Sequence, residues 1–589
     1  MVNIRRVLGA AAAAALTASA TLVSGQAADA APAPACVATP AAFATTLAHL
    51  ASPSTPGWIA SDGFYPVRLD DHRTLIIAQD TFWGTSNVNQ MLSGSMRHNS
   101  TLLFDDRNPS CFTVTAGSND GGSFPLGTNP ATAWYWPGQP AALGTTITMP
   151  MAAMGMGDNP AAGSWNFAQK YTVLRTFTLN GSTLTPSTTR TFGPTTAEPA
   201  GRQLAWVADK AIGDWVYMTG TDLRPGQWGH DVYLARVPVA DWFNRTTAPV
   251  TSTQFLTPGG WKAGATYPEL RRIIDGAGDA EVSIEHTGNE FHLIVKAYSI
   301  LGSKVIDYHA ATPEGAYTAT TIADVPDAPG TIGYHAVVQP WGAAGLTRKV
   351  TVNRNNGEDL GWGNLFVMDR YRPTLHDVIL PETVRVHTGL PAGSLAAGTV
   401  TSVGGAYAGH TKAFTCGTTP PGVSVNNFTP AGAAAGFTVT AVDASGDICI
   451  SSPAPAHFIY DLVGTSTAGG TSTRLLDTRT AGPRPAAGTV TRVHTPAADG
   501  QSVMANITAV NPSSAGHLRT WACDLPMPAT SMSNFASGRT TASFTAVEAG
   551  ASGDLCVYTS AATDLLVDFA GTTTTLDTWA SERKLDTRQ

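Results

Sequence analysis

Charged residues are scarce in this sequence, and they form no positive run. Only 13% of its 589 residues are charged, and the formal net charge is −8. A nucleic-acid-binding protein needs a basic face or a basic run to neutralise phosphates, so this composition argues against that class. After the first 30 residues, the sequence also lacks an apolar run approaching the ~20 residues of a transmembrane helix. We therefore expect neither a nucleic-acid partner nor insertion into a membrane.

Several motifs of metal sites and hydrolases are missing as well. The cysteines show no C-x-x-C spacing and the 14 histidines show no H-E-x-x-H motif, so we predict no metal site. The sequence has no G-x-S-x-G motif, which argues against a serine esterase of the α/β-hydrolase type. We predict no cofactor.

The N-terminus carries the pattern of an export signal. Arg5 and Arg6 precede an apolar run, and "ADA" before Ala31 is typical of a signal-peptidase site. We therefore predict a signal peptide over residues 1–30 and a secreted, extracellular protein.

The six cysteines indicate a repeat near the C-terminus. Cys416 and Cys449 are 33 positions apart, as are Cys523 and Cys556, and the two pairs are offset by 107 residues. A fixed period with matching cysteines predicts tandem units with one disulfide in each. Cys36 and Cys111 are left to pair, and this bond ties the mature N-terminus to the first large domain.

Similar segments close the two units, "RLLDTR" at 474–479 and "RKLDTR" at 583–588. With these ends, each unit is expected to be self-contained. The predicted domains are 31–378 for the first large domain, 379–480 for repeat domain 1 and 481–589 for repeat domain 2.

Short strand-like runs with turn signals between them dominate the first large domain. They form five clusters, near 59–115, 130–190, 204–258, 280–325 and 333–372. Each cluster is long enough for one four-stranded blade. We therefore predict an all-β chain, a five-bladed β-propeller followed by two tandem small β-sandwich-like repeat domains. A pair of β-sandwiches is the alternative for the first domain, because periodicity does not separate the two.

Two aspartates bracket a predicted hairpin in "SDGFYPVRLDDHRTLIIAQDTFWG", residues 61–84. With the turn centred on Asp71, Asp62 and Asp80 lie opposite each other, with Cβ atoms ~4.5–5.5 Å apart. Like charges so close repel, so a sequence that keeps both needs a use for them. Paired carboxylates, one protonated and one ionised, suit glycoside hydrolysis. We predict that both are catalytic, the alternative being a turn cap and a strand end.

The same stretch suggests how the two aspartates divide the work. The apolar strand before Asp80, with Phe82 and Trp83 after it, predicts a raised pKa for Asp80 and makes it the acid/base. Carboxyl groups within ~5–5.5 Å of each other are typical of retaining enzymes. A shift of one residue in the register would place the two side chains on opposite faces.

The segments "DGFYPVRLDDHRTLIIAQDTFWG", "RHNSTLLF", "AWYWPGQP", "VYLARVPVADW" and "YHAVVQP" occur in this order. This order resembles the secreted actinobacterial family of five-bladed propeller glycoside hydrolases that includes the endo-D-arabinanases. The resemblance covers roughly residues 57–372. It implies endo-acting cleavage of α-D-arabinofuranosidic linkages in the D-arabinan of cell-wall arabinogalactan and lipoarabinomannan. The C-terminal units resemble the "LDTR" repeats of many exported actinobacterial proteins, which implies attachment or binding.

Sugar sites stack aromatic rings on C–H faces and bind hydroxyls with polar side chains. The candidates for substrate binding are Trp83, His98, Asn99, Trp134, Trp136, Trp165, Glu285 and His335. Core packing is the alternative for the aromatic residues, and a strand surface for Glu285. We expect a polysaccharide as partner and a monomeric protein. A carbohydrate-binding propeller or adhesin without catalysis, and a hydrolase of another furanoside such as L-arabinan, are the alternative functions.

Overall fold

The described part of the chain folds mainly into antiparallel β-sheets, which confirms the all-β prediction. The computed structural model describes residues 35–51, 56–87, 91–115, 134–156, 167–181, 183–192, 205–223, 229–287, 290–299, 302–356, 368–430, 432–466, 473–498, 501–529, 531–548, 550–573 and 576–588. The predicted signal peptide lies outside these residues. Within them, no helix is long and apolar enough to cross a membrane.

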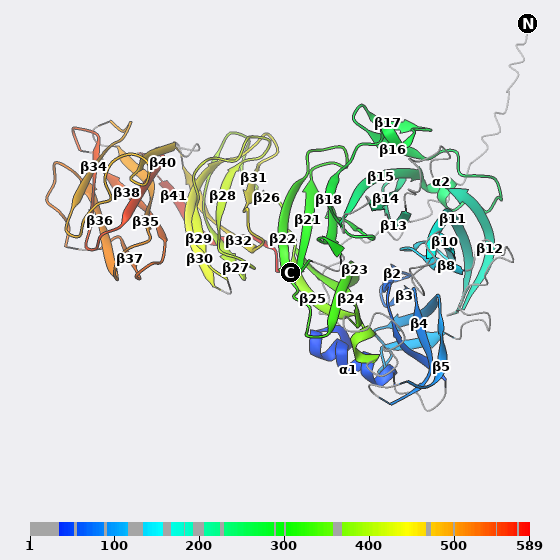
Figure 1. Ribbon diagram of the computed structural model, residues 1–589. Coiled ribbons are helices and arrows are strands. Elements are labelled where there is room, and N and C mark those ends of the chain that lie inside the picture. The colour runs from blue at the N-terminus through cyan, green and yellow to red at the C-terminus, as the bar shows by residue number, and fades with distance from the viewer. Residues whose placement is uncertain are drawn as a thin grey trace, which may run out of the picture.

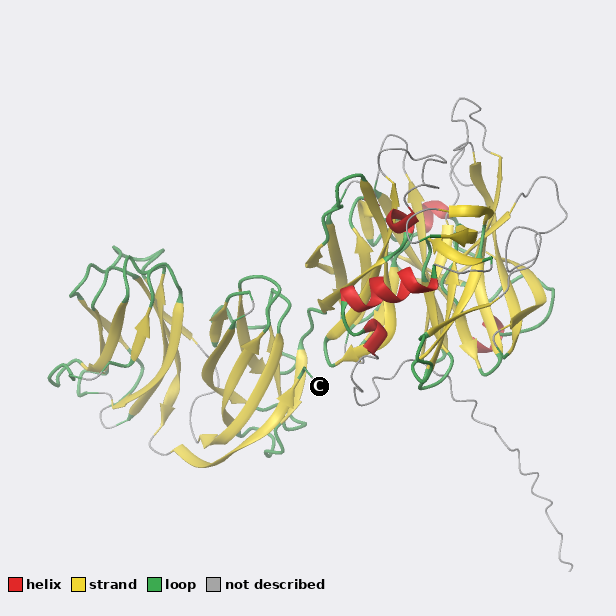
Figure 2. Cartoon of the chain, turned by 90° about the horizontal axis from the view of Figure 1, so that it is seen from below, coloured by secondary structure: helices red, strands yellow, loops and turns green. Residues whose placement is uncertain are grey.

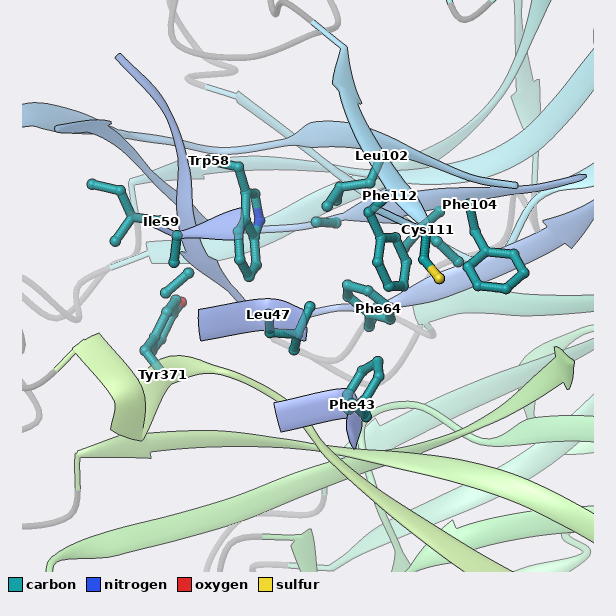
Figure 3. Packing of buried hydrophobic residues seen from close by; sticks show 14 of the residues in the cluster. Phe43, Leu47, Trp58, Ile59, Phe64, Leu102, Phe104, Cys111, Phe112 and Tyr371 are labelled. Carbon is teal, nitrogen blue, oxygen red and sulfur yellow. The ribbon is translucent and has the colours of Figure 1, made fainter. Parts of the chain in front are cut away.

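A short helical segment opens the described chain, formed by η1 (Ala35–Val37) and α1 (Pro40–Leu50). Thr39 caps α1 by accepting a hydrogen bond from the Ala42 amide at 3.1 Å, and Pro40 occupies the first turn, where its missing N–H costs nothing. Phe43 and Leu47, four residues apart, point from one face of α1 into an apolar cluster with Phe64 and Phe112 (Figure 3).

The cysteine predictions are confirmed by the structure. Cys36 pairs with Cys111 and holds the N-terminal segment against this cluster. Cys416 pairs with Cys449, and Cys523 pairs with Cys556, one disulfide in each C-terminal unit.

The first strands form two sheets. One has the order β1 (Gly57–Ser61), β4 (Thr81–Ser86) and β5 (Met91–Arg97). The other has the order β2 (Tyr65–Arg68), β3 (Arg73–Ala78), β6 (Ser100–Asp105) and β7 (Phe112–Thr115). In the β2–β3 hairpin, Tyr65 lies opposite Ile77 and Arg68 opposite Thr74, which is the predicted register.

Four further sheets follow along the chain. The second cluster contains β8 (Trp134–Pro137), β9 (Ala141–Leu143), β10 (Thr146–Met156), β11 (Phe167–Asn180) and β12 (Thr183–Phe192). The third contains β13 (Ala205–Ile212), β14 (Trp215–Leu223), β15 (His230–Pro238), β16 (Gln254–Thr257), β17 (Gly260–Ala263) and β18 (Ile274–Gly278), with α2 (Val239–Trp242) and η3 (Tyr267–Glu269) between strands. The fourth contains β19 (Ser283–His286), β20 (Phe291–Lys296), β21 (Lys304–Ala310) and β22 (Thr318–Asp324). The fifth contains β23 (Thr331–Ala344), β24 (Thr347–Asn356) and β25 (Thr374–Ile379), with η6 (Met368–Tyr371) before β25.

These sheets lie around a common centre (Figure 1). Strand β2 contacts β9, β10 contacts β13, β13 contacts β19, β19 contacts β23, and β23 contacts β2 again. A ring of sheets is typical of a propeller. The number of blades stays a prediction, since the β1–β4–β5 sheet is a sixth sheet beside the β2 sheet.

The C-terminal region has four sheets of four strands each (Figure 2). The first two are β26 (Val384–His387), β31 (Asp447–Ser451), β28 (Gly409–Thr415), β29 (Asn426–Phe428), and β30 (Ala433–Ala441), β27 (Leu395–Val403), β32 (His457–Ser466), β41 (Leu576–Asp586). The other two are β33 (Thr473–Asp477), β40 (Asp564–Thr573), β35 (Ser502–Val510), β38 (Thr541–Glu548), and β34 (Val490–His494), β39 (Asp554–Thr559), β36 (Gly516–Ala522), β37 (Ser533–Phe535). The sandwich architecture of these units stays a prediction.

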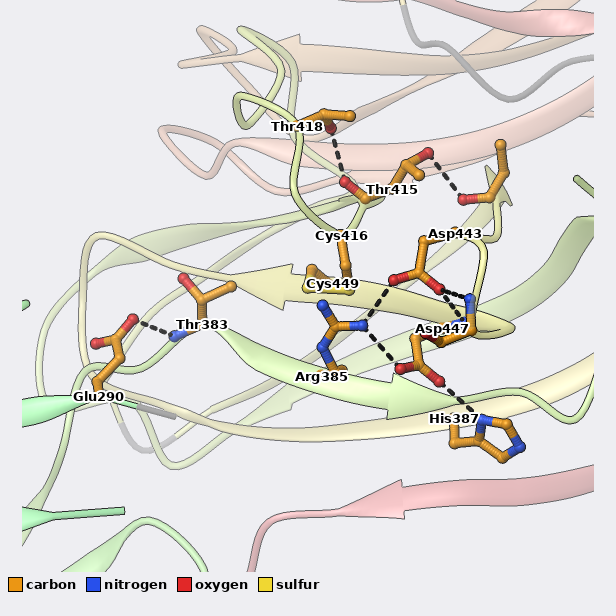
Figure 4. Close-up of a disulfide and its surroundings, with 12 residues drawn as sticks. Glu290, Thr383, Arg385, His387, Thr415, Cys416, Thr418, Asp443, Asp447 and Cys449 are labelled. Atoms are coloured by element: carbon orange, nitrogen blue, oxygen red, sulfur yellow. Dashed lines mark hydrogen bonds and ion pairs between the residues drawn. A yellow bond between two sulfur atoms is a disulfide. The ribbon is translucent and has the colours of Figure 1, made fainter. Parts of the chain in front are cut away.

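Side-chain networks recur in the two units. Figure 4 shows Arg385 donating to Asp443 and Asp447, with His387 on the other oxygen of Asp447, beside the Cys416–Cys449 disulfide. In the second unit, Arg492 and His494 make the corresponding contacts with Asp554, at 2.7 and 2.9 Å.

The two LDTR segments pair differently from the sequence expectation. Strand β33, at the end of predicted repeat domain 1, pairs with β40 of repeat domain 2. Strand β41, at the end of repeat domain 2, returns to pair with β32 of repeat domain 1. Each predicted domain therefore contributes a strand to a sheet of the other, and the expectation that each unit is self-contained is wrong.

Candidate active site

The end of the β2–β3 hairpin brings the two predicted catalytic aspartates together. The Asp62 amide donates to the Asp80 carbonyl at 3.1 Å, and the Gln79 amide donates to the Asp62 carbonyl at 3.0 Å. Gly63 makes this close approach possible, because it adopts φ +60° and a Cβ atom there would lie 2.5 Å from the Gln79 side chain. The backbone pairing therefore reaches the two aspartates, but with an irregularity, because Asp62 bonds to both Gln79 and Asp80.

Asp62 lies in surroundings that favour its protonated form. Its Oδ1 is buried without a hydrogen-bond partner among the described residues, and its Oδ2 accepts from the Tyr334 hydroxyl at 3.1 Å. Burial, followed by the charge of Asp80, raises the pKa of Asp62 to about 8, although hydrogen bonds from Tyr371 and Tyr334 work in the opposite direction. At neutral pH this carboxyl group therefore carries a proton.

Asp80 has a different environment, with donors gathered on one oxygen. Its Oδ1 lies 2.9 Å from Nδ1 of His98 and accepts from Nε1 of Trp136 at 2.8 Å. The Trp136 N–H stabilises a negative charge on that oxygen, and His98 does the same when its proton is on Nδ1. The side chain is 17% exposed, so it remains accessible from solvent.

The structure raises the pKa of Asp62, whereas the sequence had pointed to Asp80 as the acid/base. The assignment of the two catalytic roles stays a prediction. The apolar residues around Asp80 in the sequence do not enclose its carboxyl group: Phe82 and Trp83 are buried in the core cluster on the sheet of β4.

His98, Trp134 and Trp136 are brought together beside Asp80, as predicted for a sugar site. The His98 ring stacks on Trp134 with centroids 4.5 Å apart, and Trp134 meets Trp136 edge to face at 6.1 Å. Trp134 and Trp136 alternate along β8 and so share one face of that strand. These residues position Asp80, while their contact with substrate stays a prediction.

Three other candidates lie elsewhere. Trp83 packs in the core cluster with the Arg97 guanidinium 4.2 Å over its ring. Asn99 is fully buried and donates to the Tyr135 carbonyl at 3.1 Å, which ties β6 to β8. Trp165 lies outside the described residues.

Glu285 belongs to an ion pair rather than to the aspartate pair. Burial acts to raise its pKa, yet the charges of Lys210, 3.4 Å away, and Arg348 hold that pKa below its usual range. It is therefore a carboxylate anchored in the ring of sheets, and its proposed contact with substrate stays untested.

Glu281 is the carboxyl group that the sequence reasoning missed. It is nearly fully buried, and its Oε1 accepts from Gln79, the residue before Asp80, at 2.6 Å. Burial, together with the charge of Asp62, raises its pKa well above the usual value. The sequence "AEVSIE" contained a signal, because Glu281 and Glu285 would share one face if this segment were extended. No local pattern, however, shows which of the two lies near the aspartates.

His335 lies beside Glu281, in the same region as Asp62. Its amide donates to Oδ2 of Asp279 at 2.7 Å, and its Nδ1 lies 3.9 Å from Oε2 of Glu281. Burial lowers the pKa of His335, so the ring is neutral near neutral pH. No group of three His, Cys, Asp or Glu side chains in the described part of the chain is arranged to hold a metal ion.

No curated protein matches this sequence. Among solved structures, a putative hydrolase from Bacteroides ovatus shares 17% identity at a TM-score of 0.42, over 56% of this chain and 88% of that one. A glycoside hydrolase family 43 arabinoxylan arabinofuranohydrolase from Bacillus subtilis shares 12% identity at a TM-score of 0.32, over 88% of this chain and 96% of that one. An exo-β-1,3-galactanase from Phanerochaete chrysosporium shares 11% identity at a TM-score of 0.31, over 87% of this chain and 96% of that one.

Similarities of this size do not assign an activity to the protein. Its family is shown by sequence instead, because residues 50–386, more than half of the chain and all of the candidate site, match one family along their length. The protein belongs to the family described as Domain of unknown function DUF5005.

Proposed function

We propose that this protein is a secreted, endo-acting glycoside hydrolase that cleaves α-D-arabinofuranosidic linkages in cell-wall D-arabinan. The observation that carries the proposal is that two adjacent aspartates have different environments, one that favours a protonated carboxyl group and one that donates hydrogen bonds to a carboxylate. The pKa of Asp62 is raised to about 8, whereas Oδ1 of Asp80 accepts from Trp136 and contacts Nδ1 of His98. Glycoside hydrolysis needs one carboxyl group in each form.

In this mechanism Asp62 is the general acid. Its proton passes to the glycosidic oxygen as the bond from that oxygen to the anomeric carbon breaks. Asp80 attacks the anomeric carbon from the other side and forms a covalent glycosyl ester. Asp62, now a carboxylate, takes a proton from water, and that water releases the sugar from Asp80. The second step returns both groups to their starting forms.

The neighbours of the two aspartates fit these roles. The hydrogen bond from Trp136 and the contact with His98 hold the Asp80 carboxylate in one orientation. Hydrogen bonds from Tyr334 and Tyr371 hold the Asp62 carboxyl group in place, while burial and the charge of Asp80 keep it protonated. The choice of D-arabinan comes from the sequence resemblance, in which the hairpin with both aspartates is the most specific part.

Release of reducing ends from purified arabinogalactan tests the proposal. The wild-type protein should shorten the D-arabinan, and the Asp80→Asn variant should not. Release from L-arabinan alone would correct the substrate within the same class. Tight binding of arabinan with no release of reducing ends would identify a carbohydrate-binding protein instead and end the proposal.

A further inference from the structure

Two buried polar atoms without hydrogen-bond partners face each other next to Asp62. Oε2 of Glu281 and Nδ1 of His335 have no such partner among the described residues, and they lie 3.9 Å apart. A buried polar atom without a partner costs free energy, so a native fold that keeps two of them together needs a reason.

The backbone at His335 is also unusual. His335 is the extra residue of a β-bulge between Tyr334 and Ala336 on β23, and its φ is +49°. A non-glycine residue in this left-handed region is strained, and bulges near active sites re-aim side chains. The bulge lets Tyr334 reach Asp62 while the adjacent His335 lies against Glu281.

The neighbours of the two atoms determine their hydrogen-bonding character. The neutral His335 ring carries its proton on one of its two nitrogens, and with the proton on Nε2, toward the Asp279 carboxylate 3.8 Å away, Nδ1 is an acceptor. Oε1 of Glu281 already accepts from Gln79, so a protonated Glu281 presents its proton on Oε2 as a donor. One acceptor and one donor thus face the same space.

We propose that Glu281 and His335 form a binding site for a ring hydroxyl of the furanose unit next to the scissile bond. This inference rests on the proposed function. A hydroxyl oxygen can lie ~2.8 Å from both atoms at once, because they are 3.9 Å apart. Such a hydroxyl accepts from Oε2 of Glu281 and donates to Nδ1 of His335. The sugar ring is then held with its anomeric carbon near Asp62 and Asp80.

Substitutions at Glu281 test this site in an Asp80→Asn background, where binding is measured without turnover. Glu281→Gln keeps an acceptor for Gln79 and a donor at the second position, so an α-D-arabinofuranose oligosaccharide should bind with less than about threefold loss. Glu281→Met keeps the length but removes the donor, and affinity should fall by about tenfold or more. Titration calorimetry gives both values.

Glu290→Gln is the matched control. Glu290 is a part-buried carboxylate that contacts Nδ1 of His309 at 2.7 Å and accepts from the Thr383 amide, and none of these contacts involves the residues of the candidate site. Its substitution should leave the affinity for the oligosaccharide within twofold of the parent, on the order of measurement error.

A second measurement covers the case in which Glu281→Met does not fold. A crystal structure of the Asp80→Asn variant with the oligosaccharide should show one ring hydroxyl within hydrogen-bond distance of both Glu281 and His335. A water molecule alone at that point, with the sugar elsewhere, would overturn the inference. Unchanged affinity in Glu281→Met would do the same while leaving the catalytic proposal intact. Failure of the wild-type protein to release reducing ends would instead overturn the proposed function.

Discussion

The amide of Asp62 donates to the carbonyl of Asp80 at 3.1 Å, so the two aspartates are paired through their backbones while their carboxyl groups occupy different environments. Backbone pairing fixes their separation, and the surrounding sheets fix their chemistry. Asp62 accepts hydrogen bonds from residues of β23 and η6, whereas Asp80 accepts from a residue of β8. In the proposed mechanism, this difference is what lets two identical side chains on one hairpin act as acid and nucleophile.

Replacing either aspartate should stop turnover without unfolding the protein. Asn keeps the shape of Asp but supplies neither an acidic proton nor an anionic nucleophile, so Asp62→Asn and Asp80→Asn should each lower kcat by about 10³-fold or more. Circular dichroism should be unchanged. Asp71→Asn, in the exposed turn of the same hairpin, is the control and should retain wild-type kcat. Near-normal turnover in Asp80→Asn would contradict the assignment.

The activity should fall in alkaline solution because of Asp62. The general acid works only while protonated, and the pKa of Asp62 is about 8. Below that pH the proton is present. As pH rises through about 8, kcat/KM should therefore decrease by about tenfold per pH unit, since kcat/KM reports the ionisation of the free enzyme. A pH–rate profile measures this limb. An alkaline limb near pH 5, on the order of an ordinary carboxyl group, would rule out Asp62 as the acid.

The product should keep the anomeric configuration of the substrate. Residues directly opposite each other in a hairpin have Cβ atoms ~4.5–5.5 Å apart, which suits the ~5–5.5 Å between carboxyl groups of retaining enzymes better than the ~6.5–9.5 Å of inverting ones. Proton NMR of the first-formed product, taken before mutarotation, shows the anomer directly. An inverted anomer would mean that Asp80 activates water rather than attacking the sugar.

Two equivalent ion pairs in the C-terminal units should differ in their contribution to stability. Arg474 pairs with Asp568, whose side chain is 3% exposed, and Arg583 pairs with Asp461, whose side chain is 23% exposed. Burial raises the pKa of Asp568, so loss of Arg474 leaves a poorly solvated carboxylate. Arg474→Ala should cost about 3 kcal/mol of unfolding free energy, and Arg583→Ala should cost clearly less, because its ion pair is exposed to solvent. Equal losses in urea denaturation would contradict this difference.

Removal of the C-terminal units should leave the catalytic region active on soluble substrate. The candidate site lies within the sheets of residues 57–379. The C-terminal units contact this region away from the site, for example where the Leu346 amide donates to the Thr587 carbonyl and Thr347 contacts His457. A chain that ends near residue 380 should therefore cleave soluble oligosaccharides with kcat/KM within about threefold of the full chain, on the order of 0.6 kcal/mol. Action on intact cell wall should decrease if the units bind it. Loss of activity on the soluble substrate would show that these units support the site.

The hairpin and the disulfides could be read from the sequence because they depend on local patterns. Alternation along two strands and a turn between them determine which residues face each other, so Asp62 and Asp80 could be paired from spacing alone. Matching cysteines at a fixed period likewise identified the disulfides in the two units, and elimination identified the third.

Only the tertiary structure decided the chemistry of the site and the pairing of the last strands. The pKa of Asp62 depends on its burial in the fold and on hydrogen bonds from Tyr334 and Tyr371, which follow it by hundreds of residues, and no local pattern in the sequence shows these contacts. Glu281 and Glu285 are alike in sequence, and the ring of sheets alone places one near Asp62 and the other near Lys210. The two LDTR strands are nearly identical, so their partners are determined by the path of the chain between the units and not by their side chains.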